Sequence, residues 1–214
     1  MLSDAVNGKT DVLSGLISTA ILKIFLRKNF SAILKLIIIT MQKDNFIEEY
    51  FPLVNEEGKI IGKASRKECH NGSKKLHPVV HLHVFNSQGK LYLQKRSTHK
   101  DIQPGKWDTA VGGHIDYGET VEDALKRETR EELGITEFVP VKNFTYIFES
   151  SIEREMIYSF RTIYSGPVVP DTEELETGKL WSIEEIENNI GKGIFTPNFE
   201  SEFLKLQETI NNIH

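Results

Sequence analysis

Three glutamates near the middle of the chain have the spacing of a metal-binding cluster. Glu128, Glu131 and Glu132 stand at positions i, i+3 and i+4, which on a helix places their carboxylates on one face. Their mutual repulsion is unfavourable unless a cation neutralises it, and hard oxygen ligands favour Mg²⁺ or Mn²⁺. Taken alone, the glutamates also fit a solvated helix face with pairs such as Arg127 with Glu131. The surrounding residues decide between these two interpretations.

The glutamates belong to a longer pattern that runs from residue 113 to residue 135. Its fixed positions are Gly113, Glu119, Arg127, Glu128, Glu131, Glu132 and Gly134. This pattern resembles the Nudix box, and every fixed position of that box is matched. The one departure is Thr129, which stands where the box has an apolar residue. This departure removes no metal ligand and no catalytic group, so the resemblance indicates a complete box.

The resemblance implies both a fold and a set of metal ligands. Nudix proteins are α/β/α sandwiches in which the box forms a loop, a helix and a second loop. By this resemblance Glu128 and Glu132 are the principal metal ligands. Glu131 is a further ligand, directly or through water, and the carbonyl of Gly113 contributes. The cofactor that the resemblance predicts is Mg²⁺ or Mn²⁺.

The same resemblance implies metal-dependent hydrolysis of a diphosphate linkage. Arg127 and Glu119 would support the ligands, because the arginine orients the carboxylates and Glu119 fixes the loop that enters the helix. The metal would polarise the diphosphate and lower the pKa of a bound water. A carboxylate then accepts the proton, and Glu128, Glu173 and Glu174 stay open as alternatives for this general base.

The residues that would contact the rest of the substrate are less specific. Arg96 ends a predicted strand and could contact a substrate phosphate with its fork of donors, although an exposed strand-end charge explains it nearly as well. Trp107, Tyr117, Tyr146 and Phe148 could stack on a base, but core packing is favoured for most of them. A nucleoside diphosphate sugar, a nucleoside triphosphate, a dinucleotide and a prenyl diphosphate all stay open as substrates.

A second resemblance covers residues 51–198 and is to isopentenyl-diphosphate isomerase and the Nudix hydrolases close to it. The positions that match metal ligands of that isomerase are His70, His77, His114, Glu153 and Glu155. Three imidazoles with two carboxylates suit manganese, zinc or iron, so the resemblance predicts a second metal site. A plainer interpretation stays open, in which His77, His81 and His83 alternate along a strand and line a pocket while His70 lies in a loop.

The two related activities differ in one chemical requirement. The isomerases protonate an alkene with a cysteine beside the histidine motif, and here that position is Gly112. The single cysteine, Cys69, lies next to His70 instead. We therefore predict hydrolysis of a nucleoside-diphosphate-type or other organic diphosphate. The alternatives are isopentenyl-diphosphate isomerisation and a non-catalytic nucleotide sensor, although a sensor would be expected to have lost box carboxylates.

The elements that must position these residues indicate an α+β protein, and the resemblance makes it a Nudix-type α/β/α sandwich with a mixed sheet. A cap at Thr120 and a stop at Gly134 predict one well-bounded helix. Turn residues between apolar runs predict a hairpin over 51–64. The remaining predicted elements are strands at 79–85, 90–94, 109–115, 139–149, 156–164 and 180–181, and helices at 183–190 and 199–213.

Composition limits the partners and the compartment. The 214 residues carry a formal charge of −5, with no global basic field, which disfavours nucleic acid as a partner. A single cysteine allows no intrachain disulfide, so we predict a reducing cytoplasm. We interpret residues 1–40 as a dispensable or poorly ordered extension and residues 41–214 as the Nudix domain. A membrane-binding role of the extension is less favoured. The predicted partner is a small-molecule diphosphate, and a homodimer stays open.

Overall fold

A mixed sheet forms the centre of the computed structural model, which describes residues 48–99, 102–170 and 175–211. Its strands follow the order β5-β4-β3-β8-β7, with β6 paired to β3 and β9 paired to β4. All these pairs are antiparallel except β3 with β8, which run parallel. The strands of the sheet are β3 (Leu76–Phe85), β4 (Leu91–Arg96), β5 (Trp107–Asp108), β6 (Val111–His114), β7 (Val141–Glu149), β8 (Arg154–Ile163) and β9 (Leu175–Trp181). The sheet is therefore mixed, as predicted.

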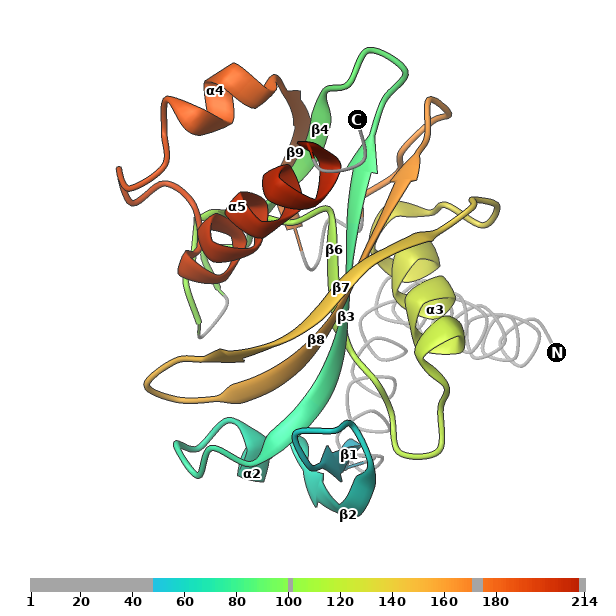
Figure 1. Ribbon diagram of the computed structural model, residues 1–214, viewed down its shortest axis with the longest axis vertical. Coiled ribbons are helices and arrows are strands. Elements are labelled where there is room, and N and C mark those ends of the chain that lie inside the picture. Colours follow the sequence, from blue (N-terminus) through green and yellow to red (C-terminus); the bar gives the residue numbers. More distant parts are fainter. Residues whose placement is uncertain (1–47, 100–101, 171–174, 212–214) are drawn as a thin grey trace, which may run out of the picture. The chain divides into compact units, whose positions relative to one another are not determined.

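Helices cover both faces of this sheet (Figure 1). The remaining elements are the hairpin β1 (Tyr50–Val54) and β2 (Ile60–Ser65), and the helices α2 (Arg66–Cys69), α3 (Val121–Leu133), α4 (Ile183–Glu187) and α5 (Pro197–Asn211). On one face, Leu82 of β3 and Leu125 of α3 share a buried core. On the other, Leu93 of β4 packs with Phe199 and Phe203 of α5. The predicted α/β/α sandwich is confirmed.

The ends of α3 follow from local chemistry. The Thr120 side chain accepts a hydrogen bond from the Asp123 backbone N–H at 3.1 Å and so caps the first turn. Gly134 ends the helix with φ of 67°, a left-handed conformation that favours glycine. Thr129, the one departure from the box pattern, is buried, and its hydroxyl donates to the Leu125 carbonyl at 2.6 Å. The helix therefore accommodates this polar residue without an unsatisfied group.

Several boundaries differ from the sequence prediction. Strand β9 begins at residue 175 rather than 180, because it pairs with β4 along its whole length, a long-range partner that its polar residues do not reveal. Gly178 lies within it against Tyr92, whose hydroxyl would be 1.9 Å from a Cβ at that position. Helix α5 begins at Pro197, and the Thr196 hydroxyl accepts from the Phe199 N–H at 3.1 Å. The short α2 and β5 were not predicted.

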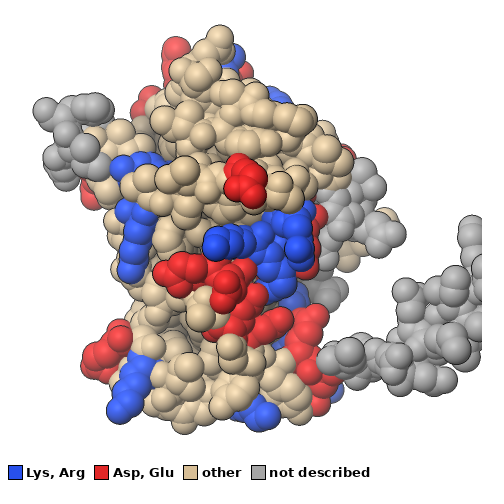
Figure 2. All heavy atoms as spheres, turned by 90° about the vertical axis from the view of Figure 1, so that its right-hand side faces the viewer, with Lys and Arg blue, Asp and Glu red and all other residues tan. Residues whose placement is uncertain are grey.

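The compact unit that carries the site runs from Glu49 to His214. The interpretation of residues 1–40 lies outside the described residues and stays a prediction. In the described part of the chain, no helix has the length and apolar content needed to cross a membrane. Acidic and basic side chains meet in one band across the face of the molecule that Figure 2 shows.

Candidate active site

One cavity of about 1030 Å³ is lined by most of the predicted site residues, although Glu119 and His77 are not among its lining residues. The glutamates of α3 line it with Gly113 and His114 of β6. Arg96 of β4, His70 and the pair Glu153 and Glu155 at the start of β8 also line it. Residues that are far apart in the sequence, from three strands, the helix α3 and the segment after α2, thus contribute to a single concave site. This is the usual form of a small-molecule site.

Gly113 allows the closest approach between the loop and the box helix. A Cβ at this position would lie 2.0 Å from the carboxyl carbon of Glu128, so no side chain fits there while Glu128 keeps its place. The Glu128 carboxylate therefore packs directly against the backbone of β6. Burial raises the pKa of Glu128, and the hydrogen bond from Arg127 opposes this shift.

Arg127 connects several parts of the box by hydrogen bonds. Its guanidinium donates two hydrogen bonds to Glu119, at 2.9 and 2.8 Å, and one to Glu128 at 2.7 Å. It also reaches the His114 carbonyl at 3.0 Å and Glu131 at 3.3 Å. These bonds, above all the two that Glu119 accepts, raise the pKa of Arg127 above its ordinary value. The arginine thus links the loop, the helix and the end of β6 through charge-assisted hydrogen bonds.

Glu132 points from α3 toward β6 and β4. Its Oε2 lies 3.3 Å from the Gln94 side-chain nitrogen and 3.4 Å from the backbone N of Gly112. Only 7% of Glu132 is exposed, whereas half of the Glu131 side chain is. The two neighbouring glutamates therefore sit in different environments, with Glu132 buried between α3 and the strands and Glu131 facing solvent.

The predicted second cluster is also assembled. One ligand atom from each of His70, His77, His114 and Glu155 lies within 4.8 Å of the others. The carboxylate of Glu153 lies beside this cluster, with its Oε2 3.6 Å from the Nε2 of His70. The parallel pairing of β3 with β8 sets His77 beside Glu155. His70 follows α2, whose start is fixed by a capping box at Ser65, a Ser-x-x-Glu signal present in the sequence.

The chemistry of this cluster fits a cation. The Nδ1 of His77 lies 2.9 Å from the Lys75 carbonyl, so it carries the proton, and the buried Nε2 has no hydrogen-bond partner. Burial lowers the pKa of His70 to about 4 and raises that of Glu155 to about 8. The Nε2 atoms of His70 and His114 lie 3.1 Å apart. Three converging imidazoles beside carboxylates in a buried position form a typical ligand set for a transition metal.

The other predicted residues have mixed outcomes. Arg96 lines the cavity, but its guanidinium is engaged by Asp108 at 3.4 Å and by the Ile102 carbonyl at 3.1 Å. Trp107 packs against Trp181 in the core, as favoured, whereas Tyr117 is exposed and Phe148 lines the cavity. The candidate bases Glu173 and Glu174 lie outside the described residues.

Sequence reasoning missed a buried ionic group that borders the cavity. Glu202 of α5 is fully buried and contacts the imidazoles of His81 and His83. Burial opposes a charged His81 ring, but the Glu202 carboxylate outweighs it and raises the pKa of His81 to about 9. The signal was present: Glu202 lies in the apolar stripe formed by Phe199, Phe203 and Leu206, where a glutamate needs a buried partner.

Comparisons with known proteins agree with this site. A family model described as NUDIX domain matches residues 75–199. An uncharacterised Nudix hydrolase of Listeria monocytogenes is 30% identical over 153 residues, which cover 71% of this chain and 90% of the relative. An isopentenyl-diphosphate Delta-isomerase of Mycolicibacterium vanbaalenii is 33% identical over 133 residues, 59% of this chain and 74% of the relative. The crystal structure of DR0079 from Deinococcus radiodurans has a TM-score of 0.61 at 25% identity, covering 69% of this chain and 92% of that one.

The fold and the complete box define a Nudix protein, and the matches place the chain within the Nudix hydrolase family. The predicted family is therefore confirmed. Its relatives include both Nudix hydrolases and isopentenyl-diphosphate isomerases, in agreement with the predicted branch. Nudix hydrolases generally use divalent metal ions.

Proposed function

We propose that this chain hydrolyses the diphosphate linkage of a small organic diphosphate, with Mg²⁺ or Mn²⁺ held by Glu128, Glu131 and Glu132. The observation that carries the proposal is the arrangement of the box around Arg127 and Gly113. Arg127 donates a hydrogen bond to Glu128, one of the proposed metal ligands. Because Gly113 has no side chain, the Glu128 carboxylate has room to lie against β6. The Gly113 carbonyl is a further ligand in this proposal. The net charge of −5 supports a small molecule rather than nucleic acid as the partner.

In this proposal the protein supplies position and the metal supplies Lewis acidity. When bound, the metal polarises the diphosphate and lowers the pKa of a bound water. Glu119 and Arg127 keep the ligands oriented through the hydrogen bonds between them. Of the three candidates for the general base, Glu128 is the one that lies within the described residues, next to Arg127. In this proposal it accepts the proton of the attacking water. Glu173 and Glu174 stay as the alternatives for this step.

We further propose that His70, His77, His114, Glu155 and Glu153 hold a second metal of the manganese, zinc or iron type. The buried and unpartnered Nε2 of His77 supports this proposal. Replacing His77 with alanine is expected to weaken Zn²⁺ binding at least about tenfold, because a ligand is lost. Isothermal titration of the protein with Zn²⁺ measures the change.

The matched control for this titration is His99→Ala, since His99 is an exposed histidine outside the cluster. It should bind Zn²⁺ like the wild type. Equal affinity of the His77→Ala variant and the wild type would contradict the second site.

Isomerisation is the second candidate, favoured by the isomerase relative and by the histidine cluster. It needs a proton donor beside the hydrocarbon, and Gly112 has none. Cys69 is fully buried, does not line the cavity, and burial raises the pKa of its thiol to about 11. These features favour hydrolysis over isomerisation.

Labelled water separates the two reactions. Hydrolysis of a diphosphate panel in heavy-oxygen water, with Mg²⁺ and then Mn²⁺, should give phosphate products that contain the label, because solvent oxygen attacks phosphorus. Cys69→Ala should not change this labelling. An allylic isomer formed from isopentenyl diphosphate by the wild type and lost in Cys69→Ala would overturn the hydrolase proposal.

A further inference from the structure

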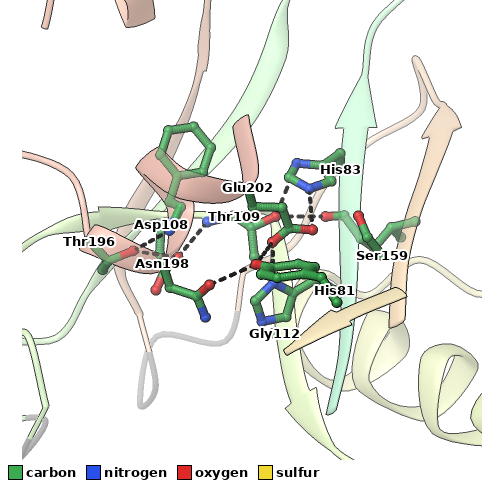
Figure 3. A network of polar contacts seen from close by, with 12 residues as sticks. His81, His83, Asp108, Thr109, Gly112, Ser159, Thr196, Asn198 and Glu202 are labelled. Carbon is green, nitrogen blue, oxygen red and sulfur yellow. Dashed lines mark hydrogen bonds and ion pairs between the residues drawn. The ribbon is translucent and has the colours of Figure 1, made fainter. Parts of the chain in front are cut away.

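A buried carboxylate ties helix α5 to strand β3 next to the cavity (Figure 3). The Oε2 of Glu202 lies 2.5 Å from Nδ1 of His81, and its Oε1 lies 2.9 Å from Nε2 of His83. The Tyr146 hydroxyl also reaches Glu202, at 3.3 Å. Glu202 and His83 have no exposed surface, so the carboxylate of Glu202 is shielded from water.

The carboxylate of Glu202 requires a positive partner. A fully buried carboxylate is strongly unfavourable unless a cation and hydrogen bonds compensate it. The described contacts of Glu202 are the two imidazoles and the Tyr146 hydroxyl, without a lysine or an arginine. The 2.5 Å contact places a proton on Nδ1 of His81. An imidazolium at His81 then balances the buried charge and carries a second proton, on Nε2.

The Nε2 side of the His81 ring lies toward the cavity. His81 is one of the lining residues, whereas His83 is not. Strand pairing sets His81 opposite Gly112, and a Cβ on Gly112 would be 3.5 Å from Nε2. The backbone N of Gly112 is in turn 3.4 Å from Glu132. Among the described residues, no hydrogen bond engages Nε2 of His81, so this donor is available beside the box carboxylates.

The other cationic groups of the cavity are arginines with more exposed partners than Glu202. Arg66, Arg96 and Arg127 line it, and each is paired with a carboxylate. A diphosphate brings several negative oxygens into this acidic cavity. Unlike these arginines, His81 is paired with a fully buried carboxylate that fixes its ring, and among the described residues no hydrogen bond uses its Nε2–H.

We propose that His81 is a catalytic residue outside the Nudix box, whose Nε2–H donates a hydrogen bond to a phosphate oxygen of the substrate while Glu202 holds the ring by Nδ1. This inference rests on the proposed diphosphate hydrolysis and adds one residue to that site. A preorganised, charged donor stabilises the negative charge that develops on phosphate oxygens as the linkage breaks. Glu202 is the positioning residue of the pair.

Two amide substitutions separate this role from a structural one. In His81→Asn the amide nitrogen replaces Nδ1, which keeps the bond to Glu202 and removes the cavity donor. In His83→Gln the amide nitrogen replaces Nε2, which keeps the other bond to Glu202 and leaves the cavity unchanged. Each variant removes one imidazole from the same carboxylate. We expect turnover to fall about 100-fold in His81→Asn and to stay close to the wild type in His83→Gln. Because His81→Asn also removes the charge that balances Glu202, turnover is compared at a temperature at which thermal unfolding shows both variants to be folded.

A binding readout tests the contact directly. Imidodiphosphate, a diphosphate that resists hydrolysis, is added with Mg²⁺ to protein labelled uniformly with ¹⁵N. The Nε2 signal of His81 should shift, and both signals of His83 should stay in place. An unshifted His81 signal, while the Gly113 amide does shift, would overturn the proposal. Turnover of His81→Asn close to the wild type, or an equal loss in both variants, would overturn it as well.

Failure of the proposed function is visible separately. A wild-type protein that hydrolyses no diphosphate refutes the hydrolase proposal, and the His81 signal then still reports whether Nε2 contacts imidodiphosphate. Conversely, strong hydrolysis by both the wild type and His81→Asn keeps the hydrolase and removes His81 from its mechanism.

Discussion

Replacing Gly113 with alanine should lower turnover by about two orders of magnitude, the scale of an ångström-sized misplacement of a catalytic group. The added methyl would lie 2.0 Å from the carboxyl carbon of Glu128, so the carboxylate must leave its place. The neighbouring Gly112 is the matched control. A Cβ there meets its nearest atoms, those of His81, at 3.5 Å, which is an ordinary contact. We expect Gly112→Ala to lose far less activity than Gly113→Ala, because its methyl touches the His81 ring at an ordinary distance and displaces no carboxylate.

Steady-state kinetics on both variants, with circular dichroism and thermal unfolding, checks this pair. Both should keep the fold, because neither glycine needs a left-handed conformation. If Gly113→Ala is as active as the wild type, Glu128 is not held against β6 during the reaction. If Gly112→Ala loses as much activity as Gly113→Ala, the loss of activity comes from a general disturbance of strand β6 and not from displacement of Glu128.

Glu132→Gln should keep the fold and lower turnover by at least about two orders of magnitude, as expected when a charge-stabilising group is removed. The amide has nearly the same shape as the carboxylate, so the packing of α3 against β6 is retained, but the negative charge for the metal is lost. Glu131→Gln should have a milder effect, because half of that side chain is exposed and its contact with the metal can pass through water.

The measurement is turnover against Mg²⁺ concentration for each of the two variants. A Glu132→Gln enzyme that saturates at the wild-type rate would remove this residue from the metal site. Equal losses in both variants would show instead that the two carboxylates act as one unit.

The sequence allowed the box helix to be predicted closely, since every determinant of that helix is local. The cap at Thr120, the stop at Gly134 and the spacing of the three glutamates all act within a few residues. The convergence of the histidine cluster rested on resemblance alone. Its physical basis is the register that sets His77 beside Glu155, which depends on strand pairing between distant segments.

Features that depend on distant partners escaped prediction. The polar first half of β9 is a strand because β4 supplies its hydrogen bonds. The need for glycine at position 113 arises from Glu128 in a different element. Glu202 lies far along the chain from His81 and His83, and its place in an apolar helix stripe signalled a buried partner without showing which one.

The parallel pairing of β3 with β8 also has a consequence for how the protein folds. Contacts between segments distant in the chain form slowly, because the intervening loop must lose its conformational entropy before the contacts form. The histidine cluster takes one ligand from each of these two strands. The cation affinity that we propose for this cluster should therefore develop only late in folding, and early, partly folded chains should be poor competitors for scarce metal. Metal capture would then favour chains that have already completed the central sheet.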